Sequence, residues 1–193
     1  MTNLNGKFTL DEINLQARTC IEKGDYQGAL GLLDQALTGI SEADGVSRAI
    51  ILSNRGFVLT GVKNYPEAIE SFRNAAALFK AQGHPVDMAM QLGNMGSVFR
   101  DEARYDQALT FYHDALSVLK EQGHQPGIAD QLSNIAYAHA QKQEFASALE
   151  NFNQAKDLYI KLGKDGKAGL CQENIAALES MEDRDGEPID ERP

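Results

Sequence analysis

The sequence predicts an all-α fold, an α–α superhelix built from four helical hairpins and a C-terminal capping helix. Three observations support this prediction. Proline is scarce, at 5 of 193 residues, in a chain rich in Ala, Leu, Gln and Glu, which favours helices. The sequence repeats itself at an interval of 40 residues. Within each repeat, apolar residues are three and four positions apart, as on one face of a helix.

The repeat is defined by small, aromatic and polar residues that recur in phase. In the first half of each unit, Leu-Ser-Asn or Leu-Gly-Asn stands at 52–54, 92–94 and 132–134, and an asparagine recurs at 174. The second half repeats three positions, which are Ala68, Ala108 and Ala148, then Phe72, Tyr112 and Phe152, then Ala75, Ala115 and Ala155. An earlier copy, with Tyr26 and Ala29, is offset by 39 residues. The chain therefore contains four related units.

Each unit is predicted to be a pair of helices. The third unit has apolar residues at helical spacing on both sides of a polar break at 101–104. Packed helices lie about 8–10 Å apart, and the closest approach requires small residues such as Gly96 and Ala108. Gly83, Gly123 and Gly163 close successive units and are predicted to end helices with a positive φ. One hairpin cannot cover its own apolar face, so neighbouring units are expected to stack.

This pattern predicts the organisation of the whole chain. A short lead at 1–9 precedes an array at 10–182. The predicted repeats are 10–44, 45–84, 85–124 and 125–164, followed by a capping helix at 166–181. Such a helix would cover the apolar end of the stack, which repeat arrays require for solubility. The acidic segment 183–193 has no apolar pattern and is predicted to be disordered.

The units resemble the tetratricopeptide repeat, whose pattern is W-x2-L-G-x2-Y…A-x3-F…P. The third unit matches it with Met95-Gly96, Phe99, Ala108 and Tyr112, whereas Leu92 replaces the tryptophan and Lys120 the late proline. A period of 40 instead of 34 residues predicts a longer second helix. Long repeats with Leu-Gly-Asn are similar to those of the LGN/Pins class of adaptors. The resemblance implies a right-handed superhelix whose inner face, lined by the first helices, binds extended or helical peptides.

Matching the chain to this family places ten residues on the inner face. They are Asn14, Arg18, Asn54, Phe57, Asn94, Ser97, Arg100, Asn134, Tyr137 and Asn174. One asparagine per repeat can bond the backbone of a bound peptide, or it can bond the neighbouring repeat and set the stacking. The two arginines can pair with acidic groups of a ligand or within the chain. The two aromatic residues can be binding anchors or can pack against the next repeat.

Charge narrows the range of partners. The chain has 18 basic and 28 acidic residues, a formal charge of −10 and a pI near 4.8. Nucleic acids and anionic membranes are therefore not expected as partners. No apolar run reaches the roughly 18 residues of a membrane span. Two isolated cysteines, Cys20 and Cys171, together with a start that does not look like a signal peptide, lead us to expect a cytoplasmic protein.

The sequence contains no motif that indicates an enzyme, a metal site or a cofactor site. Gly163–Lys167 lacks the spacing of a phosphate-binding loop and follows a predicted helix. The lysines that chaperone-binding members use to hold a terminal carboxylate are replaced by Asp11, Ile50, Met90 and Asp130. The leading hypothesis is a non-catalytic scaffold or adaptor that binds a peptide or helix of another protein. The alternatives are a self-assembling homo-oligomer and a regulatory sensor of a peptide or small molecule.

Overall fold

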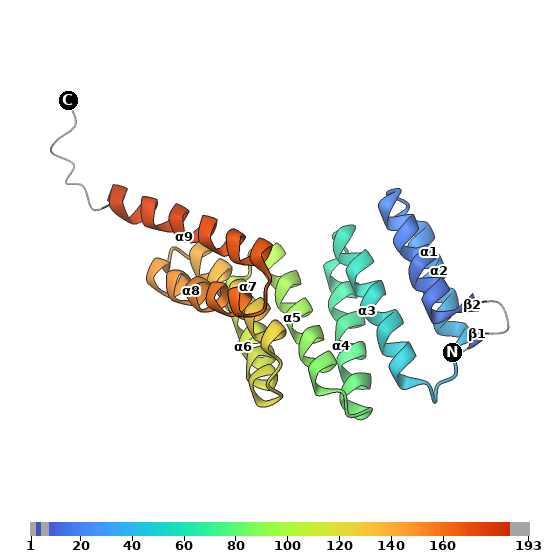
Figure 1. Cartoon of the computed structure of the whole chain (residues 1–193). Coiled ribbons are helices and arrows are strands. Elements are labelled where there is room, and N and C mark those ends of the chain that lie inside the picture. The colour runs from blue at the N-terminus through green and yellow to red at the C-terminus, as the bar shows by residue number, and fades with distance from the viewer. Residues whose placement is uncertain (1–2, 5–7, 186–193) are drawn as a thin grey trace. The chain divides into compact units, whose positions relative to one another are not determined.

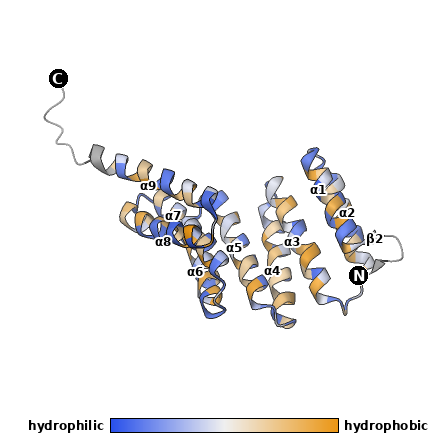
Figure 2. Cartoon of the chain, viewed as in Figure 1, coloured by the Kyte–Doolittle hydropathy of each residue, from blue (hydrophilic) through white to orange (hydrophobic). Residues whose placement is uncertain are grey.

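The computed structural model describes residues 3–4 and 8–185. These residues belong to two compact units, Met1–Val98 and Phe99–Pro193. Both units consist of antiparallel helical hairpins (Figure 1). In each of them, single helices carry hydrophobic and hydrophilic residues side by side (Figure 2). The predicted all-α repeat fold is therefore confirmed.

Unit 1 begins with a small strand pair, in which Asn3 is opposite Thr9 and Leu4 is opposite Phe8. Its elements are β1 (Asn3–Leu4), β2 (Phe8–Thr9), α1 (Leu10–Glu22), α2 (Tyr26–Gly39), α3 (Gly45–Gly61), α4 (Tyr65–Ala81) and most of α5 (Pro85–Asp101). Thr9 caps α1, because its hydroxyl accepts from the Glu12 amide while the Glu12 carboxylate accepts from the Thr9 amide. The predicted lead at 1–9 thus includes a defined helix start.

Unit 2 begins with the last residues of α5 and continues with four further helices. They are α6 (Tyr105–Glu121), α7 (Gln125–Gln141), α8 (Phe145–Lys161) and α9 (Asp165–Asp185). The two helices of the second hairpin, α3 and α4, and those of the fourth, α7 and α8, all have 17 residues. The first and second helices of these hairpins are therefore equal in length, whereas the sequence drew attention to the second helix.

The predicted small and aromatic positions form the core of both units. Ala68, Ala108 and Ala148 are completely buried, as are the rings of Phe72, Tyr112 and Phe152 to within a few percent. Close approach depends on glycine where α3 crosses α4: a Cβ on Gly56 would lie 2.6 Å from Cε1 of Phe72. The phased residues thus recur because each has the same packing partner in its own hairpin.

The turns contain residues with a positive φ at the three predicted glycines and at four further positions. Gly83, Gly123 and Gly163 have φ values of 74°, 65° and 66°. The turn within each hairpin also contains a positive φ, at Gly24 and at Lys63, Ala103 and Gln143. A side chain in this region carries a steric cost that glycine avoids. The glycine caps between hairpins are confirmed, whereas the second set of left-handed residues was not predicted.

The C-terminal helix extends beyond its predicted limits. Helix α9 starts at Asp165 and ends at Asp185, so 183–185 belong to a helix and not to the predicted disordered tail. The remainder of that tail, 186–193, lies outside the described residues. Helix α9 buries Ala168, Cys171, Ile175 and Leu178, whereas Gln172, Ala176 and Glu179 are exposed. One side of α9 is therefore packed and another faces solvent, as expected of a helix at the end of a stack.

Candidate functional site

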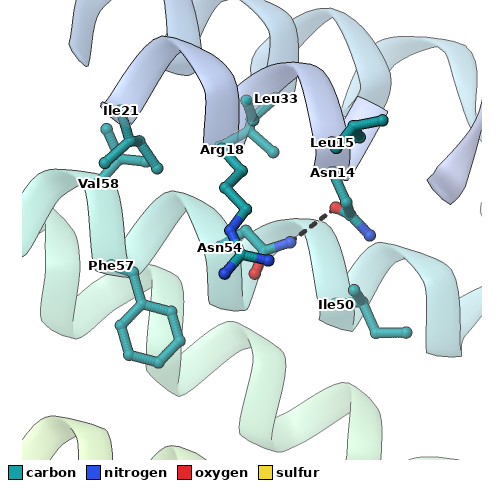
Figure 3. Close-up of a pocket in the computed structure, with 10 residues that line it drawn as sticks. Asn14, Leu15, Arg18, Ile21, Leu33, Ile50, Asn54, Phe57 and Val58 are labelled. Carbon is teal, nitrogen blue, oxygen red and sulfur yellow. Dashed lines mark hydrogen bonds between the residues drawn. The ribbon is translucent and has the colours of Figure 1, made fainter. Parts of the chain in front are cut away.

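An open hollow in unit 1 lies between the first helices of the first two hairpins, α1 and α3 (Figure 3). Its volume is about 570 Å³. The residues that line it are Asn14, Leu15, Ala17, Arg18, Ile21, Leu33, Ile50, Asn54, Phe57 and Val58. We refer to this feature as the α1–α3 hollow. Four of the ten sequence-predicted site residues line it: Asn14, Arg18, Asn54 and Phe57.

The α1–α3 hollow is mostly apolar and keeps large side chains in contact with solvent. Leu15 is 65% exposed and Phe57 is 53% exposed, although both are large hydrophobic residues. The Phe57 ring also packs edge-on against Phe72 at a centroid distance of 5.3 Å, which holds it in place. Phe57 therefore packs within its own hairpin and still presents part of its ring to solvent.

The asparagines of the first two repeats, Asn14 and Asn54, bind each other across the hollow. Asn54 Nδ2 donates a hydrogen bond to Asn14 Oδ1 at 2.7 Å, as the dashed line in Figure 3 marks. This bond joins α3 to α1 and supports the stacking role. It leaves the amino group of Asn14 and the carbonyl oxygen of Asn54 without a partner among the residues that the structure describes. The pair therefore still offers one donor and one acceptor.

Arg18 is the one charged residue among those that line the hollow. Its Nε lies 3.5 Å from Oε1 of Glu22, with side chains 79% and 67% exposed. An ion pair this open to water contributes little energy, because solvent screens it. The guanidinium extends from α1 toward Asn54 in Figure 3. It can therefore exchange Glu22 for an acidic group of a ligand at small cost.

The remaining predicted residues of unit 1 bind within the chain. Asn94 donates to Oε1 of Gln91 at 3.1 Å, and the same oxygen accepts from the Ser53 hydroxyl at 2.8 Å. Gln91 and Ser53 are buried, so this network links α5 to α3 inside the unit. The Ser97 hydroxyl donates to the Gly93 carbonyl at 3.2 Å. Neither Asn94 nor Ser97 lines the hollow.

In unit 2, Arg100 is paired internally. Its Nε and Nη2 donate to Oδ1 of Asp101 at 3.0 and 2.8 Å, and its guanidinium lies 5.7 Å from the centre of the Tyr137 ring. Burial disfavours the charged form of Arg100, but the hydrogen bond and attraction from Asp101 outweigh it and raise the pKa. Arg100 and Tyr137 therefore form a cation–π pair on the surface, where Tyr137 keeps 43% of its area exposed.

The two asparagines of unit 2 differ from those of unit 1. Asn174 is exposed on α9 and donates to the carbonyl of Leu170 in its own helix at 2.9 Å. Asn134 is half-buried and has no hydrogen-bond partner within the described part of the chain. The asparagines thus recur at equivalent positions of the sequence, but their hydrogen-bond partners differ from repeat to repeat.

A polar cluster at the end of unit 2 attaches α9 to the hairpin before it. Asp130 of α7 accepts from the Tyr159 hydroxyl at 2.6 Å and from the Lys167 ammonium at 2.5 Å. The Lys167 ammonium also lies 5.4 Å from the centre of the Tyr159 ring. Burial, together with the hydrogen bond to Asp130, raises the pKa of the Tyr159 hydroxyl. Lys167 belongs to the segment Gly163–Lys167, which was compared above with a phosphate-binding loop. Its ammonium group is bound to a carboxylate.

Among the described residues, no group of three or more His, Cys, Asp and Glu side chains could hold a metal ion. Burial raises the pKa of the Cys171 thiol, which favours the unreactive protonated form. No helix in the described part of the chain is long and apolar enough to span a membrane.

Sequence reasoning did not select Ile21, Leu33 and Val58 as lining residues of the hollow. A signal for two of them was present. Ile21 stands seven residues after Asn14 and three after Arg18, and Val58 stands four after Asn54. These spacings place each residue on the same helical face as a predicted one.

The family profile of the tetratricopeptide repeat matches residues 47–121 and 86–161, which together cover more than half of the chain. The chain belongs to the tetratricopeptide repeat family. The narrower likeness to the LGN/Pins class stays an expectation. A search of curated proteins finds no match.

Several solved structures have the same fold. The apo form of RapI has a TM-score of 0.79 and 16% identity, and the alignment covers 93% of this chain and 52% of RapI. Aspartyl phosphate phosphatase F from Bacillus subtilis has a TM-score of 0.78 and 16% identity, with coverages of 95% and 51%. The Rap conjugation gene regulator of plasmid pLS20, in complex with the Phr* peptide, has a TM-score of 0.65, 16% identity and coverages of 86% and 52%. The chain spans about half the length of these proteins, and the likeness establishes the fold.

Proposed function

We propose that this tetratricopeptide repeat protein is a non-catalytic scaffold or adaptor that binds a peptide or helical segment of a partner protein. The observation that carries the proposal is the α1–α3 hollow, in which exposed apolar side chains surround a polar pair of amides. Clusters of exposed large apolar residues with a few convergent polar groups are typical of binding sites. A structural neighbour, the pLS20 regulator, was solved in complex with a peptide.

The contacts in unit 1 suggest how binding would gain energy. A ligand side chain seated against Leu15, Ile50 and Phe57 would remove apolar surface from water, at roughly 25 cal/mol per Å². The free donor of Asn14 and the free acceptor of Asn54 can bond a peptide group of the ligand, which offers one acceptor and one donor. Neither contact requires a chemical step, so the proposal includes no catalytic residue.

The proposal can be tested by selecting random displayed peptides on the immobilised full chain and measuring their affinities by calorimetry. Phe57→Asp is expected to weaken the selected peptides by at least tenfold, because it places a charge at the apolar wall. Ile160→Asp is the matched control, since Ile160 is an equally exposed apolar residue on α8, outside the hollow. If no peptide binds, or if both variants bind as the parent does, the proposal is wrong.

Self-assembly is the alternative that the same hollow leaves open. Light scattering at several protein concentrations separates the two hypotheses. A mass that rises with concentration and is restored to that of a monomer by Phe57→Asp would show that the hollow binds a second copy. A constant monomer mass together with peptide binding supports the adaptor.

A further inference from the structure

We propose that the α1–α3 hollow recognises an internal segment of a partner in which a large apolar residue stands next to an aspartate or glutamate. This inference rests on the proposed function and specifies its ligand. It follows from three features of the hollow: the shape and chemistry of its walls, its single charge and the unsatisfied groups of its asparagine pair.

The walls require an apolar side chain. Leu15 and Ile21 project from α1, and Ile50, Phe57 and Val58 project from α3, on either side of the opening (Figure 3). A cavity of about 570 Å³ is larger than a single side chain needs, so an apolar residue can enter together with part of its own backbone. A small or polar residue at this place would leave the exposed wall of Leu15 and Phe57 uncovered.

The charge requires an acidic neighbour. Among the residues that line the hollow, one is cationic, Arg18, and none is acidic. A ligand carboxylate can replace the exposed carboxylate of Glu22, whose Oε1 lies 3.5 Å from Nε of Arg18. A carboxylate at the hollow would receive a charge-assisted hydrogen bond beside a ligand that excludes water, where such bonds are stronger. Arg18 thus attracts acidic groups locally. The net charge of −10 of the whole chain acts in the opposite direction, because it repels acidic ligands at long range.

The asparagine pair is complementary to a backbone peptide group of the ligand. Asn14 Nδ2 can donate to a carbonyl oxygen and Asn54 Oδ1 can accept from an amide hydrogen, which is the complement of a peptide bond. A carboxylate has no hydrogen to give to Asn54, so it cannot take the place of the peptide group at this pair. We place a peptide group at the asparagines and assign the acidic group, which faces Arg18, to a side chain of a segment that continues on both sides.

The test is an array of peptides that are acetylated at the N-terminus and tethered through a C-terminal amide, probed with the full chain. The expected result is enrichment of an apolar residue adjacent to Asp or Glu. For one such peptide in solution, Arg18→Gln should weaken binding by about tenfold. Arg18→Glu should bind a matched peptide with Lys in place of the acid more tightly than it binds the original.

Two further variants separate recognition from folding. Asn14→Asp keeps an oxygen for the bond from Asn54 and adds a negative charge, so it should reject the acidic peptide by at least tenfold while unfolding at the same temperature. Asn153→Ala changes an exposed asparagine that bonds its own helix on α8 and should bind as the parent does.

Each outcome bears on the inference. Bound peptides that show no acidic preference, or whose affinity is unchanged by Arg18→Gln, would overturn it and leave the proposed function intact. Peptides that bind only with a free C-terminal carboxylate would overturn the assignment to a side chain. If nothing on the array and no displayed peptide binds, both this inference and the proposed function are wrong.

Discussion

At the scale of single residues, the repeat determines which side chains must be small. Position 56 shows the effect, since Gly56 is buried and faces the ring of Phe72 across the α3–α4 contact. Gly31 on α2 is its opposite, because a Cβ there would meet no atom within 4 Å. The same residue type thus has two different reasons to occur in one array.

Gly56→Ala is expected to destabilise the protein by about 1–3 kcal/mol, because the new methyl group would overlap Phe72 in a packed core. Urea unfolding followed by circular dichroism measures the change. Gly31→Ala serves as the control and should stabilise by about 0.5–1 kcal/mol through the helix preference of alanine. Equal effects of the two variants would show that packing against Phe72 is not the cause.

Gly83→Ala tests the backbone alone. Its φ is 74° and a Cβ would meet nothing within 4 Å, so any loss of stability arises from the left-handed conformation. We expect a loss of about 1 kcal/mol. The converse change, Ala103→Gly at a φ of 58°, should be neutral or stabilising, although glycine costs entropy elsewhere in helical proteins. A marked loss of stability in Ala103→Gly would contradict this account of the turn.

At the scale of helices, polar contacts tie neighbouring elements together in unit 1. Arg55 on α3 donates to Asp34 of α2 at 2.8 Å, to Ser71 of α4 at 2.9 Å and to Glu67 of α4 at 3.2 Å. Three helices therefore meet at one guanidinium, most of which is shielded from solvent. Arg18 is a useful comparison, since its pair with Glu22 lies within one helix and is exposed.

Arg55→Met should lower the free energy of unfolding by about 1–2 kcal/mol, because it removes three hydrogen bonds and leaves the buried Ser71 hydroxyl without this donor. Arg18→Met should change it by no more than about 0.5 kcal/mol. Thermal and urea unfolding of both variants measure the difference. A larger effect at Arg18 than at Arg55 would mean that the three-helix contact contributes nothing to stability.

A second prediction for the helices concerns pH and His113 of α6. Burial lowers its pKa from the ordinary value of 6.5, nearby positive charge on His139 and Lys120 lowers it further, and Asp114 acts in the opposite direction. The unfolded chain therefore binds a proton at a higher pH than the folded one. Stability from this group is present above 6.5 and is lost as the pH falls from that value through the lower pKa of the folded state. His113→Gln should accordingly lose less stability than the parent between pH 7.5 and 5.5.

Unfolding curves at several pH values test this sign. Glu144 does not confuse the result, because its pKa is lowered from 4.5 by hydrogen bonds to Lys142 and His139, and its contribution changes only in more acidic solution. If His113→Gln loses as much stability as the parent over this interval, the histidine is not responsible.

At the scale of the whole molecule, the period was enough to predict the fold, because one pattern of burial recurs at equivalent positions. Ala68, Ala108 and Ala148 are all completely buried for this reason. The period did not predict contacts of polar side chains. Asn94 bonds Gln91, whereas the residue at the equivalent place before Asn54 is Ile51, which offers no acceptor. Equivalent asparagines thus differ because their neighbours differ.

The α1–α3 hollow was predictable only in part for a related reason. Helical spacing identifies the apolar residues of α1 and α3 and does not tell which of them another helix covers. Ile13 and Ala17 are buried in the core, whereas Leu15, between them in sequence, is open to solvent. Asn14 and Arg18 were assigned by resemblance to the family, and their common place beside Ile21 and Val58 needed the structure.

The last prediction is that ligand binding acts locally along the chain. In repeat proteins stability is a sum of terms between adjacent elements, so opening of one part need not open the rest. A peptide selected on this protein should slow hydrogen exchange in α1 and α3, which line the hollow, and leave exchange in α8 and α9 unchanged. Mass spectrometry of proteolytic fragments, with and without peptide, measures this. Phe57→Asp should abolish the difference, and Ile160→Asp should preserve it. Equal protection of all helices would show that the peptide stabilises the chain as one cooperative body, and protection confined to α8 and α9 would place the binding site outside the hollow.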